Sequence, residues 1–308
     1  MSYLLVAALG LNGTSALCAL LVPLAYYVIG LRDRSVVERV SIRLQVGIGL
    51  VNGIKHIVSC LSLKGDDSVW CNFLGFLSSL LFHVYLCLNV CISVNLHLVV
   101  VSNRKPNRRW ETCYWTASFV LPIALNFPLT IAGIFGKDRR GTCYIRHGPT
   151  TNGLLELVYL SLLPLGIVVY CLLVSAITFK KTEDSLEKMR SLIAITCLYQ
   201  TTCFLSCIGA TIAFMYHFFV GPVSTFLKVW AFWGLSTMGI LNLIAFLADP
   251  LVFKSLSRLL LPQDKQADPN PVPSSYPISY HQLMHLKDAS DPRTVSQGVM
   301  LKEFQTFL

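Results

Sequence analysis

The chain has 308 residues, of which 54% are hydrophobic and only 13% are charged, with a formal net charge of +9. A soluble domain carries about twice this charged fraction, so the composition argues against a water-soluble fold. The hydrophobic residues gather in blocks long enough to span a bilayer, which takes about 20 residues. The blocks cover about 3–31, 43–63, 72–101, 112–135, 153–179, 190–218 and 225–252. We therefore predict an all-α bundle of seven transmembrane helices, forming one domain over residues 1–261.

The two ends of the chain are predicted to differ from the bundle. The first block runs to Leu31 without the basic start typical of a signal peptide, so we expect a first membrane helix. After helix seven, the apolar residues of 251–260 surround Lys254 and Arg258, which predicts a short amphipathic helix on the inner leaflet. Residues 262–308 are rich in Pro, Ser and Asp without a sustained period, and they predict a disordered cytoplasmic tail.

The distribution of Lys and Arg predicts the orientation of the bundle. With the N-terminus outside, 18 of the 25 basic residues fall in cytoplasmic segments and 6 in outer segments, while Lys55 lies within a span. This excess follows the positive-inside rule, although the outer segment 136–152 carries four cations against it. We therefore expect the N-terminus outside and the C-terminus inside. The same placement argues that the net positive charge serves the lipid bilayer and not nucleic acid.

Two of the eleven cysteines stand apart from the rest. Cys71 begins the third span and Cys143 lies in the polar segment after the fourth, so both fall on the predicted outer, oxidising side, where disulfides persist. We expect a bond between them, which would tie the second outer loop to the top of helix three. Cys60, near the outer end of the second span, is the competing partner, and two free thiols are the remaining alternative.

The predicted topology resembles that of the G-protein-coupled receptors, which share the cysteine at the top of helix three and the cysteine in the second outer loop. The stretches ISVNLHLVVV in helix three and ILNLIAFLADPLVFKSL in helix seven look like a narrower family. This family comprises the fungal and slime-mould receptors that include the cyclic-AMP-receptor-like and glucose-sensing receptors. The resemblance covers residues 1 to about 260. It implies a plasma-membrane receptor that senses a small molecule and signals to a heterotrimeric G protein without a cofactor.

The sequence departs from the rhodopsin-like receptors at several places. Asn242 and the pair Asp249 and Pro250 stand where those receptors carry an Asn-Pro-x-x-Tyr signature. The region 98–105, at the end of helix three, contains no acid, so a lock between an acid and an arginine is not expected there. Helix six has no proline, which leaves Gly209 as the candidate for a bend.

Ionisable and aromatic side chains in the outer halves of the helices are the candidate ligand contacts, because ionisable residues inside a membrane are costly and usually functional. The candidates are Lys55, His83, Glu156, Tyr159, Trp230 and Trp233. Lys55, Lys228 and the basic outer loop favour an anionic or nutrient-like, for example sugar-like, ligand over a cation. Structural roles compete with this hypothesis, since a lysine can snorkel, an acid can favour a helix start and tryptophans can form an interfacial belt.

Two further sets of residues are assigned to the inner half of the bundle. A polar switch is predicted because a carboxylate near the inner face needs a partner, and its residues are Asn52, Asn89, Asn242, Asp249 and Pro250. Capping of the short helix after Pro250 is the alternative role of Asp249. The cations predicted to meet a G protein are Arg104, Lys105, Lys180 and Lys181. Anchoring of helix ends at the cytoplasmic face explains the same four cations.

Other functions are weighed against the receptor. A membrane transporter or channel is the main alternative, but the halves 1–135 and 136–260 show neither a repeat nor matching broken helices. A retinal protein would need a lysine near the middle of helix seven, where only Lys228 occurs, at the outer end. An enzyme is not expected, since the sequence contains no metal-ligand spacing, nucleophile motif or phosphate-binding loop.

Overall fold

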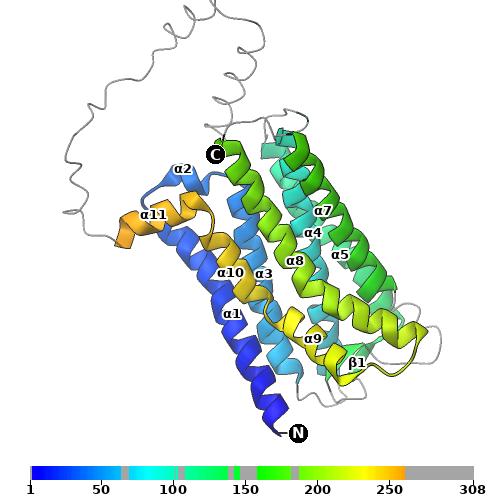
Figure 1. Cartoon of the computed structure of the whole chain (residues 1–308). Coiled ribbons are helices and arrows are strands. Elements are labelled where there is room, and N and C mark those ends of the chain that lie inside the picture. Colours follow the sequence, from blue (N-terminus) through cyan, green and yellow to red (C-terminus); the bar gives the residue numbers. More distant parts are fainter. Residues whose placement is uncertain are drawn as a thin grey trace, which may run out of the picture.

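The computed structural model describes residues 2–63, 69–100, 102, 108–137, 142–145, 158–181 and 187–260. Most of these residues are helical, and the longest helices lie side by side as a bundle (Figure 1). The long helices are α1 (Ser2–Gly30), α3 (Val40–Ser62), α4 (Val69–Val100), α5 (Arg108–Ile131), α7 (Leu163–Lys181) and α8 (Glu187–Phe219). A short π-helix, η1 (Val158–Leu162), leads directly into α7. The predicted tail at 262–308 lies outside the described residues.

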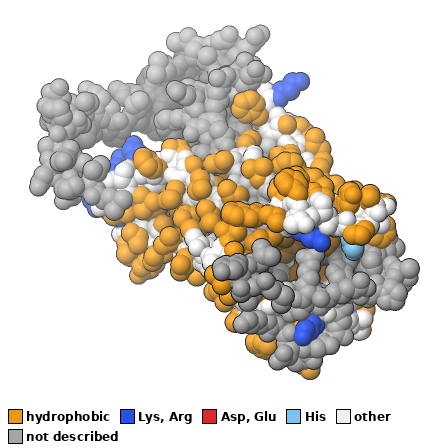
Figure 2. Space-filling view, turned by 60° about the horizontal axis from the view of Figure 1, so that its bottom comes forward, with side chains coloured by type: hydrophobic (Ala, Val, Ile, Leu, Met, Phe, Trp, Pro, Cys, Tyr) orange, Lys and Arg blue, Asp and Glu red, His pale blue; other side chains and the backbone are white. Residues whose placement is uncertain are grey.

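Six of the described helices are long and apolar enough to cross a membrane, and a bent helix pair adds a seventh if it forms one span. The pair consists of α9 (Thr225–Ser236) and α10 (Met238–Leu247), whose directions differ by 46°. The predicted all-α bundle is confirmed, the segment predicted as helix seven is divided by this bend, and the count of seven spans stays a prediction. The helices in Figure 2 present mainly hydrophobic side chains on their outer surface, as helices that face lipid do.

One end of the bundle carries a short hairpin that was predicted only as a loop. Strands β1 (Phe135–Lys137) and β2 (Cys143–Ile145) pair in antiparallel fashion. They lie at the same end of the bundle as the N-terminus of α1 (Figure 1). The hairpin rests directly on α4, because a Cβ atom added at Gly75 would lie 2.7 Å from the backbone oxygen of Tyr144. We name this end of the bundle the hairpin end.

The opposite end carries two short helices, α2 (Arg34–Val37) and α11 (Pro250–Leu260). Helix α11 runs across this end of the bundle and does not continue the direction of α10 (Figure 1). Its Val252 is buried while its Phe253 is exposed. The predicted short helix is therefore present, and its position on a lipid leaflet stays a prediction. We name this end the α11 end.

The core of the bundle is centred on α4, which contacts α3, α5, α7, α8 and both strands. Its side chains Tyr85, Leu86 and Leu88 are fully buried. A helix surrounded in this way must be hydrophobic on all sides, and α4 is. A second cluster, which includes Tyr199 of α8 and Phe246 of α10, joins these two helices to α1 near the α11 end.

Helix α8 runs without a break from Glu187 to Phe219, and it changes direction along its length (Figure 1). The bend suggested at Gly209 itself stays a prediction. Gly209 permits close packing of two helices. A Cβ atom there would lie 3.2 Å from the backbone oxygen of Trp230 in α9. Small residues let membrane helices approach in this way, since the backbones can then make van der Waals contact.

Candidate functional site

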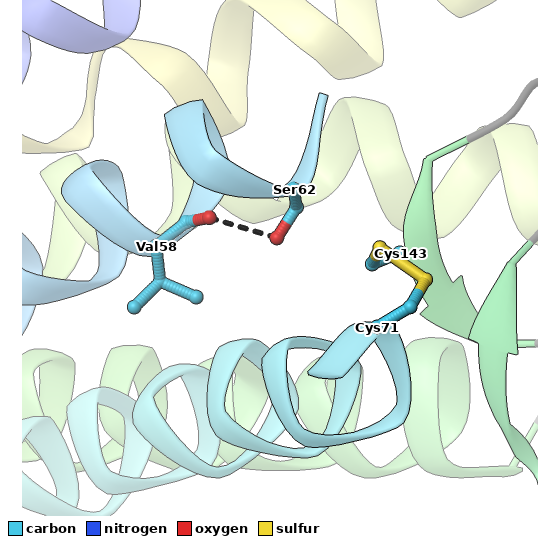
Figure 3. The surroundings of a disulfide bond; sticks show 4 residues. All are labelled: Val58, Ser62, Cys71 and Cys143. Carbon is cyan, nitrogen blue, oxygen red and sulfur yellow. Dashed lines mark hydrogen bonds between the residues drawn. A yellow bond between two sulfur atoms is a disulfide. The ribbon is translucent and has the colours of Figure 1, made fainter. Parts of the chain in front are cut away.

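A cavity of about 220 Å³ lies at the hairpin end, lined by residues of α1, α3, α4, α8, α9 and β2. Cys143 is part of its wall and forms a disulfide with Cys71, with the two Cα atoms 5.0 Å apart. Figure 3 shows this disulfide beside Ser62, which also lines the cavity. The structure thus contains the expected bond, which joins helix α4 to strand β2, while Cys60 is a free thiol.

Lys55 of α3 lines the cavity and is only 6% exposed. Its Nζ atom lies 3.5 Å from Met238 Sδ and 5.9 Å from the centre of the Phe82 ring. The acidic side chains that the structure describes belong to the other end of the bundle, and none of them pairs with Lys55. They are Asp33, Glu38, Glu111 and Asp249. The Lys55 ammonium group is therefore buried with a thioether and an aromatic ring as its neighbours, and snorkelling does not describe its position.

Hydroxyl groups and aromatic rings make up much of the remaining wall. Ser59 and Ser62 donate their hydroxyl hydrogens to carbonyl oxygens of their own helix, at 2.9 and 2.7 Å, which leaves their oxygen atoms as acceptors. Phe82, Phe214 and Phe232 supply apolar surface. A wall of this kind suits a small molecule with an apolar body and a few polar groups, one of them placed against Lys55.

A chain of buried hydrogen bonds connects the cavity to the break between α9 and α10. The backbone N–H of Gly239, in the first turn of α10, donates to Ser15 Oγ at 2.9 Å. Ser15 Oγ lies 3.0 Å from His56 Nε2, and His56 Nδ1 lies 3.0 Å from Asn12 Oδ1. Asn12 donates its amide hydrogen to Ala8 O at 3.0 Å and lines the cavity.

The directions of these bonds follow from the chemistry of the groups. Asn12 Oδ1 can only accept, so His56 Nδ1 carries the proton. The Nε2 atom of the neutral ring must then accept, and Ser15 donates its hydroxyl hydrogen to it. Ser15 in turn accepts from Gly239. The network is complete when His56 is neutral, and it binds α1, α3 and α10 at one point.

This hydrogen-bond network was not predicted from the sequence, where only the spacing of two polar residues hints at it. Asn12 and Ser15 are three residues apart and therefore lie on one face of α1. Their partners His56 and Gly239 are 41 to 224 residues away from Ser15 along the chain. Such separations leave no local periodicity to detect.

His83 and Tyr159, two predicted ligand contacts, lie outside the residues that line the cavity. The Nδ1 atom of His83 is 2.8 Å from Ser79 O, and its Nε2 atom is 3.3 Å from Tyr159 O. Asn126 of α5 is also within 3.3 Å of the ring. His83 therefore joins α4, α5 and η1, and the structure does not bring it together with Lys55.

The predicted aromatic contacts are also separate from the cavity. Trp230 and Trp233 of α9 are 37% and 55% exposed, and neither lines the cavity. Their exposure on an apolar helix agrees with the alternative of an interfacial belt. Glu156 lies outside the described residues.

The predicted polar switch is not assembled in the described part of the chain. Asp249 accepts a hydrogen bond from the Leu251 backbone N–H at 3.0 Å, so it caps α11, which begins at Pro250. Asn89 donates to Tyr85 O at 2.9 Å within its own helix. Asn52 and Asn242 are buried, and neither forms a side-chain hydrogen bond to Asp249.

An ionic group surrounds this cap at the α11 end. Burial raises the pKa of Asp249 above its ordinary value, while the Leu251 N–H and the Arg39 guanidinium oppose that rise. Burial likewise lowers the pKa of Arg39, and the carboxylates of Asp249 and Asp33 oppose the change. Ser255 of α11 donates to Asp33 Oδ2 at 3.4 Å. The start of α11 is therefore held to the start of α3 and the end of α1.

A second ionic contact at the α11 end joins α3 to α5. Arg43 donates two hydrogen bonds of 2.6 Å to the carboxylate of Glu111. Among the predicted G-protein contacts, Lys180 is exposed at the end of α7. Lys181 is the last residue of that helix, and its side chain is not described. Arg104 and Lys105 lie outside the described residues.

No protein-family model matches the sequence, and no curated protein matches it either. The helices and the cavity therefore define the class of protein. It is a bundle of apolar helices, six of them long enough to cross a membrane, with a partly polar cavity at one end of the described bundle. Among the described residues, no three His, Cys, Asp or Glu side chains are grouped as metal ligands would be.

Proposed function

We propose that the chain is a seven-transmembrane, G-protein-coupled receptor at the plasma membrane, with its N-terminus outside. The hairpin end then faces the exterior and holds a small-molecule site in the cavity. The α11 end faces the cytoplasm, where Lys180, Lys181, Arg104 and Lys105 meet a heterotrimeric G protein. The bent pair α9 and α10 counts as the seventh span.

The cavity and its hydrogen-bonded link to the helix break carry this proposal. A receptor must convert binding at one face into movement at the other, and it needs a two-state element between the two. The break between α9 and α10 lies against Ser15 and Lys55. From this break, α10 leads to α11 at the other end of the bundle. The disulfide supports the same orientation, because disulfides persist on the oxidising side.

The link also favours a receptor over a transporter. Transporters use the free N–H groups of broken helices to bind substrate at the centre of the membrane. Here the Gly239 N–H in the first turn after the break is bonded to Ser15. The break is thus stabilised by the protein's own side chain.

Nucleotide exchange on purified G proteins tests the proposal. Membranes that contain the chain should accelerate exchange for at least one G-protein class, and the double variant Arg104→Ala/Lys105→Ala should reduce it. The matched control is Lys137→Ala/Lys228→Ala, which removes two exposed cations from the hairpin end. Exchange equal to that of empty membranes for every class would overturn the receptor proposal. Solute flux into liposomes would replace it with a transporter.

A further inference from the structure

We propose that the ligand is a small organic acid carrying a single negative charge, and that its anionic group binds Lys55. This deepens the receptor proposal and rests on it for its biological meaning, since the same cavity is the outer ligand site. The binding itself is a property of the cavity and can be measured without a G protein.

The first observation behind this inference is that no acidic side chain among the described residues pairs with Lys55. A cation taken out of water costs several kcal/mol unless a partner compensates it. Among the described residues, Met238 Sδ and the Phe82 ring lie near the Lys55 ammonium group, and they offer weak attraction and no negative charge. An anion in the cavity supplies the missing charge.

The rest of the lining limits the charge and character of the ligand. Among the cavity-lining residues that the structure describes, Lys55 is the one cation, so a single carboxylate balances their charge and a dianion exceeds it. Phe82, Phe214 and Phe232 favour an apolar body. Ser59 and Ser62 act as acceptors because their hydroxyl hydrogens are bonded to the helix, so they would repel a second anionic group.

The position of Lys55 gives such a ligand a route to the helix break. The ammonium group donates to Met238, the first residue of α10, and that residue is fully buried. A carboxylate would draw this donor away from the thioether, because a charge-assisted hydrogen bond is stronger than one to sulfur. Binding would therefore change the contact between Lys55 of α3 and Met238 at the break between α9 and α10, next to the Gly239–Ser15 bond.

Thermal unfolding of the purified, detergent-solubilised chain tests the proposal with three acids and their amides: acetate with acetamide, butyrate with butyramide, and benzoate with benzamide. At least one acid should raise the unfolding temperature more than its amide does. Lys55→Met should weaken the binding of that acid by about tenfold or more, the typical effect of a hydrogen bond to a charged group. Lys55→Arg keeps the charge and should keep the preference for the acid. The control Lys228→Gln changes an exposed lysine of α9 and should bind like the wild type.

Lys55→Met should also raise the unfolding temperature without any ligand, because it removes a buried charge and keeps an unbranched chain. Three results would overturn the proposal: no acid distinguished from its amide, a preference that survives in Lys55→Met, or a stronger response to inorganic phosphate than to every monocarboxylate. G-protein exchange without acid binding would remove the anion assignment and leave the receptor. Acid binding without nucleotide exchange would remove the receptor proposal and leave the anion assignment.

Discussion

Replacing Gly239 with alanine tests the contact on which the site depends. A Cβ atom at this position would overlap the backbone oxygen of Ser15 and would lie 2.7 Å from Ser15 Oγ, whereas ordinary contact begins at 3.4 Å. The clash is with backbone, so a side-chain rotation cannot relieve it. Helices α1 and α10 must separate by roughly 1 Å, which stretches the 2.9 Å bond from Gly239 to Ser15 beyond the normal limit of about 3.2 Å.

The expected cost has two parts. A buried N–H without a partner costs about 1–3 kcal/mol, and an overpacked core position costs about 1–3 kcal/mol more. Alanine recovers roughly 0.5–1 kcal/mol because it is the better helix former. The net loss of about 1–5 kcal/mol should lower the unfolding temperature by at least about 1.5 °C, at roughly 1.5 °C per kcal/mol for a chain of this size.

Thiol-reactive dye fluorescence provides the assay, since Cys203 and Cys207 are buried and react once the bundle opens. Gly13→Ala is the matched control. Gly13 lies in α1 close to Ser15, and an added Cβ atom there meets no atom within 4 Å. It should leave the unfolding temperature unchanged or slightly raised. If Gly239→Ala proves as stable as Gly13→Ala, α1 and α10 do not touch as the structure places them.

Three further predictions concern the two ends of the bundle. The double variant Cys71→Ser/Cys143→Ser should destabilise the bundle by about 2–5 kcal/mol, because it loses a disulfide that closes a long loop. Each single variant should lose the same stability as the double variant. A double variant as stable as the wild type would show that the bond is absent. Arg43→Gln and Glu111→Gln should each lower the unfolding temperature, because two 2.6 Å hydrogen bonds join these side chains. Their double-mutant cycle should show a coupling free energy of about 0.5–3 kcal/mol. Purely additive effects would contradict the pairing. The pKa of Asp249 is raised by burial, so the folded state opposes its ionisation and this penalty is absent below the ordinary value of 3.8. The unfolding temperature should therefore fall as the pH rises above 3.8. The variant Asp249→Asn, which retains an acceptor for the Leu251 N–H, should show a smaller fall. An identical pH profile in the variant would exclude Asp249 as the source of the pH dependence.

Local sequence patterns were sufficient for much of the fold. The long apolar blocks predicted the helices because a helix satisfies its own backbone hydrogen bonds, which makes it the natural form of an apolar segment in lipid. The residues around Lys254 and Arg258 likewise predicted α11, since its amphipathic period is a property of consecutive residues. The sequence also singled out Cys71 and Cys143, because two cysteines on the oxidising side narrow the choice of partners.

Only the tertiary structure decided how helix seven breaks and which polar residues share a cavity. The segment around Thr237 contains no proline, and the break depends on Ser15, a residue of the first helix, to receive the Gly239 N–H. The rotation of each helix about its axis determined that Lys55 faces the cavity while Trp230 and Trp233 face outward. A helix that is apolar on all sides carries almost no record of that rotation, because lipid and a packed interior accept the same side chains.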